Sequence, residues 1–241
     1  MSDKLNALII GGSSDIGKEI IKSMMDTDEF NIYYTYNRNE ISFGDGVEGI
    51  KASLDSEEGL LEFLPKVYGL DANVVVYCPG VNPSTLSKDL EHETIMQTTW
   101  INYLSAIEIF NHAIKRMLEK KNKRNKLIYI SSAAAREVEP GGGLYGSNKI
   151  AVERYLASLA IEVGRFGIRT LSIAPAFIDS KMLRDYCDKS GISLNKIKKN
   201  NPTGEVLSPK DVSNTIMSFI NGDIVLTGNT ISIGNGEGVF K

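Results

Sequence analysis

The sequence predicts a doubly wound α/β fold, in which helices cover both faces of a parallel sheet of about seven strands. Short apolar segments that are typical of buried strands alternate with longer segments of helical periodicity along the whole chain. A glycine-rich turn, Gly11 to Gly17, joins the first predicted strand to the first predicted helix, as in open parallel sheets. No linker or internal repeat interrupts this alternation, so we expect residues 1–241 to form a single domain.

In the first half of the chain, apolar segments predict strands at 5–10, 31–36, 49–52 and 73–77. The segment 16–25 follows the glycine-rich turn and has helical spacing. A further helix begins near Ser56, because the neighbouring acidic residues favour the positive end of a helix dipole and apolar residues follow them. Apolar residues then recur at helical spacing from Ile95 to Met117, which predicts one long helix over 94–118.

In the second half, the apolar run 126–132 predicts a buried strand, and a long helix is predicted around Tyr145 and continues to Val163. A strand at 169–174, a helix at 211–220 behind Ser208 and Pro209, and a strand at 230–233 complete the alternation. Periodicity is poor at about 181–204, so we expect a long loop there. A loop of that length in a compact domain is usually functional or mobile.

Composition excludes several classes of protein. The chain has 241 residues, 42% of them hydrophobic, and a formal net charge of -3, so nothing in its overall charge points to nucleic acid or a membrane as a partner. Its first apolar run ends at Gly11, too early for a signal peptide, and we expect a cytoplasmic protein. Cys78 and Cys187 form no disulfide framework, and His92 and His112 lack ligand spacing, so no catalytic metal is predicted.

Tyr145 and Lys149 form the most informative pair. They are four residues apart at the start of a predicted helix, so their side chains share one face. The positive charge of Lys149 is expected to lower the pKa of the Tyr145 phenol, which could then exchange a proton with a substrate oxygen. Ser132 stands at the end of a predicted strand, and Asn102 is a polar residue within an apolar helix stripe.

Together with the Gly11–Gly17 turn, these residues resemble the short-chain dehydrogenase/reductase family, in order from about Leu8 to Gly236. The chain is most similar in appearance to the 3-oxoacyl-acyl-carrier-protein reductases of that family. The resemblance implies a Rossmann-type sheet and an NADP(H)-dependent oxidoreductase that reduces a ketone or oxidises a secondary alcohol. It also implies that Ser132 polarises the carbonyl, Tyr145 exchanges the proton, Lys149 holds the nicotinamide ribose and Asn102 positions a relay water.

The resemblance further implies a set of cofactor-binding residues: Gly11, Ser13, Ser14, Asp15, Ile16, Gly17, Arg38, Ser53, Leu54, Gly80, Tyr145, Lys149, Pro175, Ile178 and Ser180. Arg38 stands where NADP-preferring members keep an arginine for the 2′-phosphate, so the expected cofactor is NADP(H). The chain departs from the family pattern at Asp15, which replaces a glycine, and at Pro79 and Ala176. These departures keep open an alternative, a nucleotide-binding sensor or assembly partner without turnover. A sugar-nucleotide epimerase is less favoured, because the chain has no room for an additional substrate domain.

The expected partners are a small-molecule or carrier-linked carbonyl substrate and further copies of this chain. The resemblance implies a homotetramer, or a dimer, that uses the helices of Trp100 and Tyr145 and the final strand. A basic cluster also precedes the strand at 126, and its members are Lys115, Arg116, Lys120, Lys121, Lys123, Arg124 and Lys126. Its simplest interpretation is a solvated helix end, and docking of an acidic carrier protein is the alternative.

Overall fold

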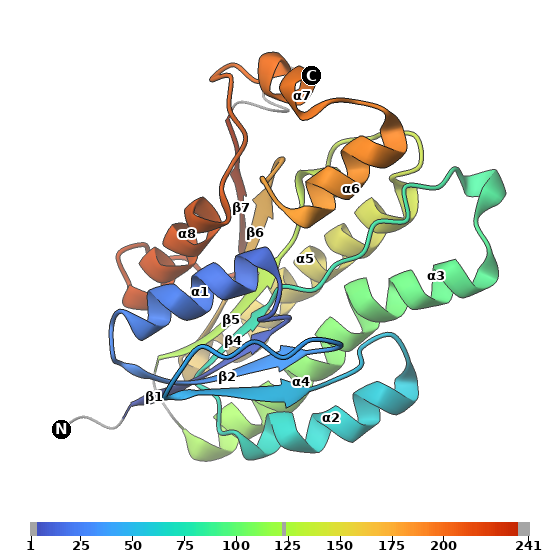
Figure 1. Cartoon of the computed structure of the whole chain (residues 1–241). Helices are drawn as coiled ribbons and strands as arrows, with labels where there is room; N and C mark the ends of the chain where they lie inside the picture. Colours follow the sequence, from blue (N-terminus) through green and yellow to red (C-terminus); the bar gives the residue numbers. More distant parts are fainter. Residues whose placement is uncertain (1–3, 122–123, 236–241) are drawn as a thin grey trace.

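A single parallel sheet organises the protein, shown in Figure 1 as a computed structural model that describes residues 4–121 and 124–235. The sheet has seven strands in the order β3-β2-β1-β4-β5-β6-β7, and all neighbours run parallel. The strands are β1 (Leu5–Ile10), β2 (Phe30–Tyr36), β3 (Val47–Lys51), β4 (Val74–Tyr77), β5 (Asn125–Ile130), β6 (Ile168–Pro175) and β7 (Asn229–Ile233). The predicted fold class is therefore confirmed, and the strand order reverses between β1 and β4, where sheets of this type bind ligands. Lys123 and Gly236, named above, lie outside the described residues.

Serine caps begin many of the helices. The helices are α1 (Asp15–Met25), α2 (Glu57–Gly69), α3 (His92–Thr99), α4 (Ser105–Lys120), α5 (Gly143–Val163), α6 (Lys181–Ser190), α7 (Leu194–Asn200) and α8 (Pro209–Asn221). The serine side chains that accept a backbone hydrogen bond at a helix start are Ser14, Ser56, Ser180, Ser193 and Ser208. Each cap satisfies an amide that the first helical turn would leave without a partner.

The core has two layers, one on each face of the sheet. Leu8 and Ile10 of β1 pack with buried residues of α2, α4 and α5, whereas Ala7 and Ile9 pack with those of α1 and α8. Figure 1 shows α1 and α8 side by side on one face and α2 and α4 on the other. This alternation is what a strand buried on both faces requires. Within the described ranges, no helix is both long and apolar enough to cross a membrane.

The segment 181–204 differs from its prediction as a long loop. It contains α6 and α7, which lie together at the top of Figure 1. Both helices are short and largely exposed, and each buries a single residue, Leu183 in α6 and Ile197 in α7. Met182, Leu183 and Tyr186 of α6 do recur at helical spacing, but α6 and α7 span only 10 and 7 residues, which is too short for periodicity to indicate them among polar neighbours.

The predicted long helix over 94–118 is confirmed as one continuous helical rod from His92 to Lys120, but with a defect. The turn Trp100–Leu104 is a π-helix between α3 and α4. Such π-turns often occur at functional sites. This one places Ile101 in the lining of the cavity described next, with Asn102 buried behind it.

Candidate active site

A cavity of about 570 Å³ opens at the carboxyl ends of the central strands. It lies among the Gly11–Gly17 turn, the segment after β4, the segment after β5, the start of α5 and the start of α6. The predicted site residues that line it are Ser13, Ser14, Asp15, Ile16, Gly80, Ser132, Tyr145, Lys149, Pro175, Ile178 and Ser180. A volume of this size suits a small-molecule ligand.

The glycine-rich turn depends on the absence of side chains. Gly11 has a φ of 72°, and its amide donates to the Thr35 hydroxyl at 2.8 Å. A Cβ on Gly17 would lie 2.5 Å from the Gly11 carbonyl oxygen, and a Cβ on Gly12 would lie 2.5 Å from the Cβ of Tyr34. Gly12 was not among the predicted site residues, although close approach to β2 requires it. The turn thus brings the N-terminus of α1 to the cavity, where its amides can meet an anion.

Asp15 connects two elements across the cavity mouth. Its carboxylate accepts a hydrogen bond from the Lys181 amide at 2.9 Å and lies 3.7 Å from the Lys18 ammonium. The sequence predicts this carboxylate near a phosphate of the cofactor. The structure shows that it also satisfies the first amide of α6 and so links α1 to that helix.

Tyr145 lies beside Ser132 on the floor of the cavity. Tyr145 is 6% exposed, and burial raises its pKa to about 12, although a hydrogen bond from Ser132 acts in the opposite direction. The prediction that Lys149 lowers this pKa was wrong for the cofactor-free protein. The Lys149 ammonium lies over the tyrosine ring, 5.6 Å from its centroid, and burial of the phenol dominates.

Lys149 is 1% exposed and is held by backbone carbonyls. Its ammonium donates to the carbonyl oxygens of Ile130 at 2.8 Å and Pro79 at 3.2 Å, and lies 4.7 Å from the Tyr129 ring centroid. Burial lowers the pKa of Lys149 to about 7. Since an ammonium has three N–H donors, one remains for a group in the cavity. Gly80 is required beside it, because a Cβ there would lie 3.1 Å from Nζ.

Asn102 acts on the backbone in this structure. Its side-chain amide donates to the Val81 carbonyl at 2.8 Å and its side-chain oxygen accepts from the Val81 amide at 2.9 Å. Its own carbonyl accepts from the Tyr129 hydroxyl at 2.9 Å, and the Ile101 carbonyl accepts from Tyr77 at 2.5 Å. The hydroxyls of Tyr77 and Tyr129 thus donate hydrogen bonds to two backbone carbonyls of the π-turn. The side chain holds the segment after β4, and its role toward a relay water stays a prediction.

The segment after β6 supplies a backbone donor. Ile178 forms a parallel bridge with Leu207 that uses the Phe177 carbonyl and the Asp179 amide. Because the N–H and C=O groups of successive residues in an extended segment point to opposite sides, the Ile178 amide points away from Leu207. Ser180 follows and caps α6. These positions agree with the predicted contact of Ile178 with a cofactor amide.

Arg38, Ser53 and Leu54 lie outside the cavity, on the same edge of the sheet. Arg38 is exposed two residues after β2, while Ser53 follows β3 and donates to Asp55. Leu54 is buried, and its carbonyl accepts from Ser105 at 2.9 Å. The three residues therefore do not contact the reactive groups. They lie further along the same carboxyl edge of the sheet, in the direction in which a long cofactor would extend.

An ion pair beside the site, between the buried Glu153 and the half-exposed Arg136, was not predicted. Glu153, 5% exposed on α5, binds Arg136 through both carboxylate oxygens and also accepts from Ser131 and Thr230. This network fastens the segment after Ser132 to the helix of Tyr145. An acidic residue on the buried stripe of that helix, four residues after Lys149, was the available signal.

The other candidate groups are simpler. Burial raises the pKa of the Cys78 thiol to about 12, so it stays protonated near neutral pH. In the part of the chain that the structure describes, no group of three or more His, Cys, Asp or Glu side chains is arranged to hold a metal ion.

Known proteins resemble the chain in sequence and in structure. The family profile described as short chain dehydrogenase matches residues 5–191. The 3-oxoacyl-acyl-carrier-protein reductase of Rickettsia conorii is 27% identical over 237 residues, which cover 95% of each chain. The solved structure of 4-hydroxyisoleucine dehydrogenase complexed with NADH superposes with a TM-score of 0.89 at 21% identity, over 99% of this chain and 100% of the other. That of ElxO with NADP bound gives 0.83 at 24% identity, over 95% and 97%.

Proposed function

Because the chain belongs to the short-chain dehydrogenase family, we propose that it is an NADP(H)-dependent oxidoreductase that reduces a ketone or oxidises a secondary alcohol. One observation carries the proposal: Ser132, Tyr145 and Lys149 meet in a cavity that also receives the glycine-rich start of α1. The cavity therefore combines a proton donor with a site for a dinucleotide.

The residues present fit a nicotinamide dinucleotide. Gly17 lets the turn close against the start of α1, where the amides favour a pyrophosphate, and Gly80 keeps the surface beside the Lys149 ammonium free of a Cβ. Lys149 has one N–H to offer a ribose hydroxyl, and the Ile178 amide suits a carboxamide. When bound, the cofactor would supply or accept the hydride.

The chain's own residues would handle the proton. In the reducing direction, Ser132 donates a hydrogen bond to the substrate carbonyl oxygen, and Tyr145 transfers its proton to that oxygen. A raised pKa keeps Tyr145 protonated at neutral pH, as a proton donor must be. In the oxidising direction the phenol must first lose its proton. The positive charge that favours this loss is Lys149, whose own pKa near 7 makes it sensitive to ligands in the cavity.

NADP is preferred over NAD on the basis of Arg38. Its guanidinium is exposed at the edge where the adenosine ribose would lie, and β2 ends without an acidic residue until Glu40. Glu40 lies near the Tyr36 hydroxyl, at 3.3 Å. An arginine suits a 2′-phosphate, whereas a carboxylate suits ribose hydroxyls. ElxO was solved with NADP and 4-hydroxyisoleucine dehydrogenase with NADH, so the choice depends on this chain's own residues.

The substrate end of the cavity is lined by Val81, Phe177, Met182 and Tyr186, with Glu137 and Glu139 also contributing. Phe177 and Tyr186 lie 5.9 Å apart, ring centroid to centroid. This apolar wall suits the carbon chain of a ketone. The likeness to the Rickettsia reductase favours a 3-oxoacyl thioester, free or linked to a carrier protein.

The test is NADPH oxidation, followed by absorbance, over a panel of 3-oxoacyl thioesters, small ketones, quinones and keto sugars. We expect turnover of at least one ketone, and NADPH to support a higher kcat/KM than NADH. Tight binding of NADPH without oxidation across the panel would instead favour the sensor without turnover.

A further inference from the structure

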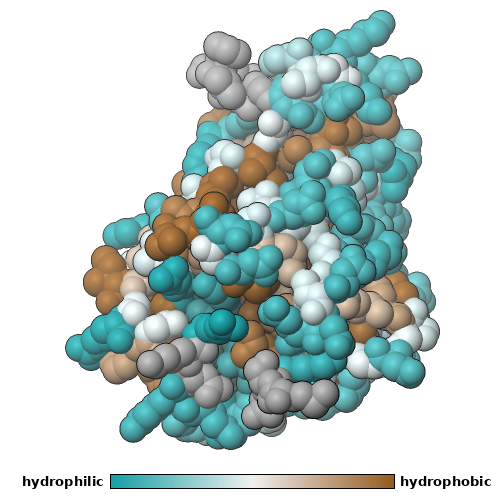
Figure 2. All heavy atoms as spheres, turned by 90° about the vertical axis from the view of Figure 1, so that its left-hand side faces the viewer, coloured by the Kyte–Doolittle hydropathy of each residue, from teal (hydrophilic) through white to brown (hydrophobic). Residues whose placement is uncertain are grey.

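A second cavity of about 780 Å³ lies at the opposite edge of the sheet, among the amino ends of the strands. The cationic residues that line it are Lys121, Arg124, Lys126, Arg165 and Arg169, and the one acidic lining residue is Glu29. Figure 2 looks onto the left-hand side of Figure 1, where this edge lies, and shows hydrophobic residues exposed between hydrophilic ones. None of the residues assigned above to catalysis or cofactor binding lines this cavity.

Lys126 is the innermost cation. It is 7% exposed at the start of β5, and its ammonium lies 4.8 Å from the centroid of the Phe219 ring. Burial lowers its pKa, and the positive charges of Arg169 and Arg124 lower it further. No ion pair between Lys126 and a carboxylate occurs among the residues that the structure describes.

Two other cations of the predicted basic cluster, unlike Lys126, form ion pairs with carboxylates. Arg116 and Lys120 both pair with Asp71, and Arg116 also pairs with Glu119 at 3.3 Å. The structure therefore separates a paired part, Arg116 and Lys120 of α4, from Lys121, Arg124 and Lys126, which line the cavity and form an unpaired part among the described residues. Lys115 belongs to neither part. Arg169 joins the unpaired part from β6.

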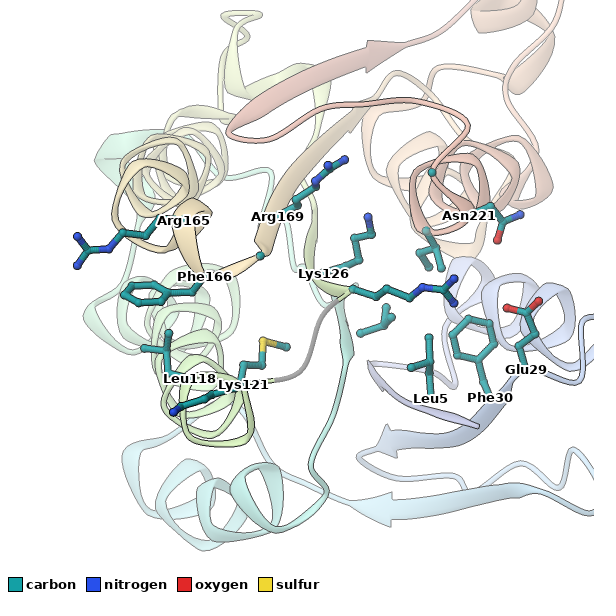
Figure 3. A pocket seen from close by; sticks show the side chains of 16 residues that line it. Leu5, Glu29, Phe30, Leu118, Lys121, Lys126, Arg165, Phe166, Arg169 and Asn221 are labelled. Carbon is teal, nitrogen blue, oxygen red and sulfur yellow. The ribbon is translucent and has the colours of Figure 1, made fainter. Parts of the chain in front are cut away.

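Lys126 is buried close to Arg169 and Arg124 and forms no ion pair with Glu29, the acidic lining residue, which is unfavourable because a buried charge is costly unless it is paired. An anion between them would remove this cost. Arginine is well suited to it, because its planar guanidinium binds phosphate or carboxylate oxygens in pairs. Figure 3 shows Lys126 and Arg169 in the middle of the cavity, whereas Arg165 extends away from it. Lys126 and Arg169 thus form the centre of the site, and Arg124, close enough to lower the pKa of Lys126, lines the cavity beside them.

Apolar side chains form a further part of the lining and restrict the class of ligand that the cavity suits. Leu5, Phe30, Val74 and Ile220 contribute apolar surface next to the cations. The volume falls in the range of small-molecule sites. A docked protein would meet exposed cations at the rim, while Lys126 is accessible only to a group that enters the hollow. We propose that this cavity binds a small phosphorylated molecule, with the phosphate held by Lys126, Arg169 and Arg124.

The test is calorimetric titration and thermal denaturation in phosphate-free buffer, with inorganic pyrophosphate and ribose 5-phosphate as probes. At least one probe should bind and raise the Tm, as a ligand specific for the folded state does. Lys126→Met removes the charge and keeps an unbranched side chain. It should weaken that binding about 10-fold or more, the effect expected for a charge-assisted hydrogen bond. The probe that binds more tightly distinguishes an inorganic from an organic phosphate.

Lys115→Met is the matched control, because Lys115 is an exposed lysine of α4 outside the cavity. It should leave binding unchanged. Without ligand, Lys126→Met should be at least as stable as the parent, since it removes a repelled charge. Arg169→Gln provides a second variant at the same site, with the same expected loss.

Three results would overturn the proposal. One is the absence of binding by either probe at millimolar concentration. Another is binding of the probe with equal affinity to the parent, Lys126→Met and Arg169→Gln. The probe would then bind elsewhere, at the anion-binding glycine-rich turn. The third is binding of a polyglutamate peptide alone, which would make this face a docking surface for an acidic protein.

Discussion

Tyr145 and Lys149 lie four residues apart on α5, and burial moves their pKa values in opposite directions, to about 12 and about 7. The spacing of the pair could be predicted from sequence. The balance between charge and desolvation could not, because it depends on how deeply the two side chains are covered. Without a cofactor, the phenol holds its proton firmly and the ammonium loses its proton easily.

Lys149 predicts a pH dependence of stability. Its pKa falls from an ordinary value of 10.5 to about 7 on folding, so the unfolded chain binds more protons between these values. The resulting destabilisation is complete below pH 7 and is relieved as the pH rises from 7 toward 10.5, by up to about 1.4 kcal/mol per pH unit. Urea denaturation of the cofactor-free protein at pH 7 and pH 9 should show this gain.

Lys149→Met should be more stable than the parent at pH 7 and should lack that part of the gain between pH 7 and 9. Lys22→Met, at an exposed position of α1 outside the cavity, is the control and should keep the gain of the parent. Equal pH dependence in parent and Lys149→Met would show that Lys149 is charged in the folded protein.

Arg38 predicts the cofactor preference. Arg38→Asp removes a charge-assisted contact with the 2′-phosphate and puts a carboxylate in its place. Such contacts change affinity about 10–150-fold. The ratio of kcat/KM for NADPH to that for NADH should therefore collapse or invert, mainly through KM. A parent that prefers NADH, or an unchanged ratio in the variant, would refute this role.

Arg136 predicts a cost in stability. Arg136→Met would leave the buried Glu153 carboxylate without its cationic partner. Because the Arg136 side chain is 44% exposed, the loss should be discounted to about 1–3 kcal/mol in urea denaturation. Arg154→Met, an exposed position on the same helix, should change stability by less than about 0.5 kcal/mol. Equal stability of the two variants would count against the network.

At the scale of elements, the strands and the long helices were predictable because each buries a stripe of apolar side chains. The first strand, Leu5–Ile10, agrees with its predicted bounds, and the caps at Ser56 and Ser208 agree with the predicted helix starts. The π-turn at Trp100–Leu104 left no signal, because its carbonyls are satisfied by Tyr77 and Tyr129, which are distant in sequence. Helices α6 and α7 were missed because they are short and bury one residue each, and the serine caps at Ser180 and Ser193 were not used as start signals.

Asp15 predicts how firmly α6 is held. Asp15→Ala removes the acceptor of the Lys181 amide and therefore loosens the connection between α1 and α6. Limited trypsin digestion should cut the segment 181–204 several-fold faster in the variant, because local opening exposes its lysines. Asp179→Ala removes a surface pair with Arg184 and serves as the control. Equal cleavage of the parent and both variants would show that Asp15 does not restrain α6.

At the scale of the whole molecule, the parallel sheet brings distant parts of the chain to one edge. Ser132 follows β5, Gly80 follows β4, Ile178 follows β6, and the start of α1 follows β1. The resemblance to the family identified these residues, and each of them follows a predicted strand. The sequence could not show that Asn102 would hold Val81, because that contact depends on how the π-turn packs against the segment after β4. Nor could it show that Lys126 and Arg169 would meet at the opposite edge, because that depends on the register between β5 and β6.

The most direct test of the central claim is the activity of Tyr145→Phe, which keeps the buried ring and removes the proton donor. Proton transfer by a positioned group contributes about 10²–10⁴-fold, so kcat on the best ketone of the panel should fall by at least about 100-fold. NADPH binding, measured by fluorescence titration, should stay within a few-fold of the parent, because the phenol is not expected to dominate cofactor affinity. Turnover within a few-fold of the parent would contradict the assignment of Tyr145 as the acid.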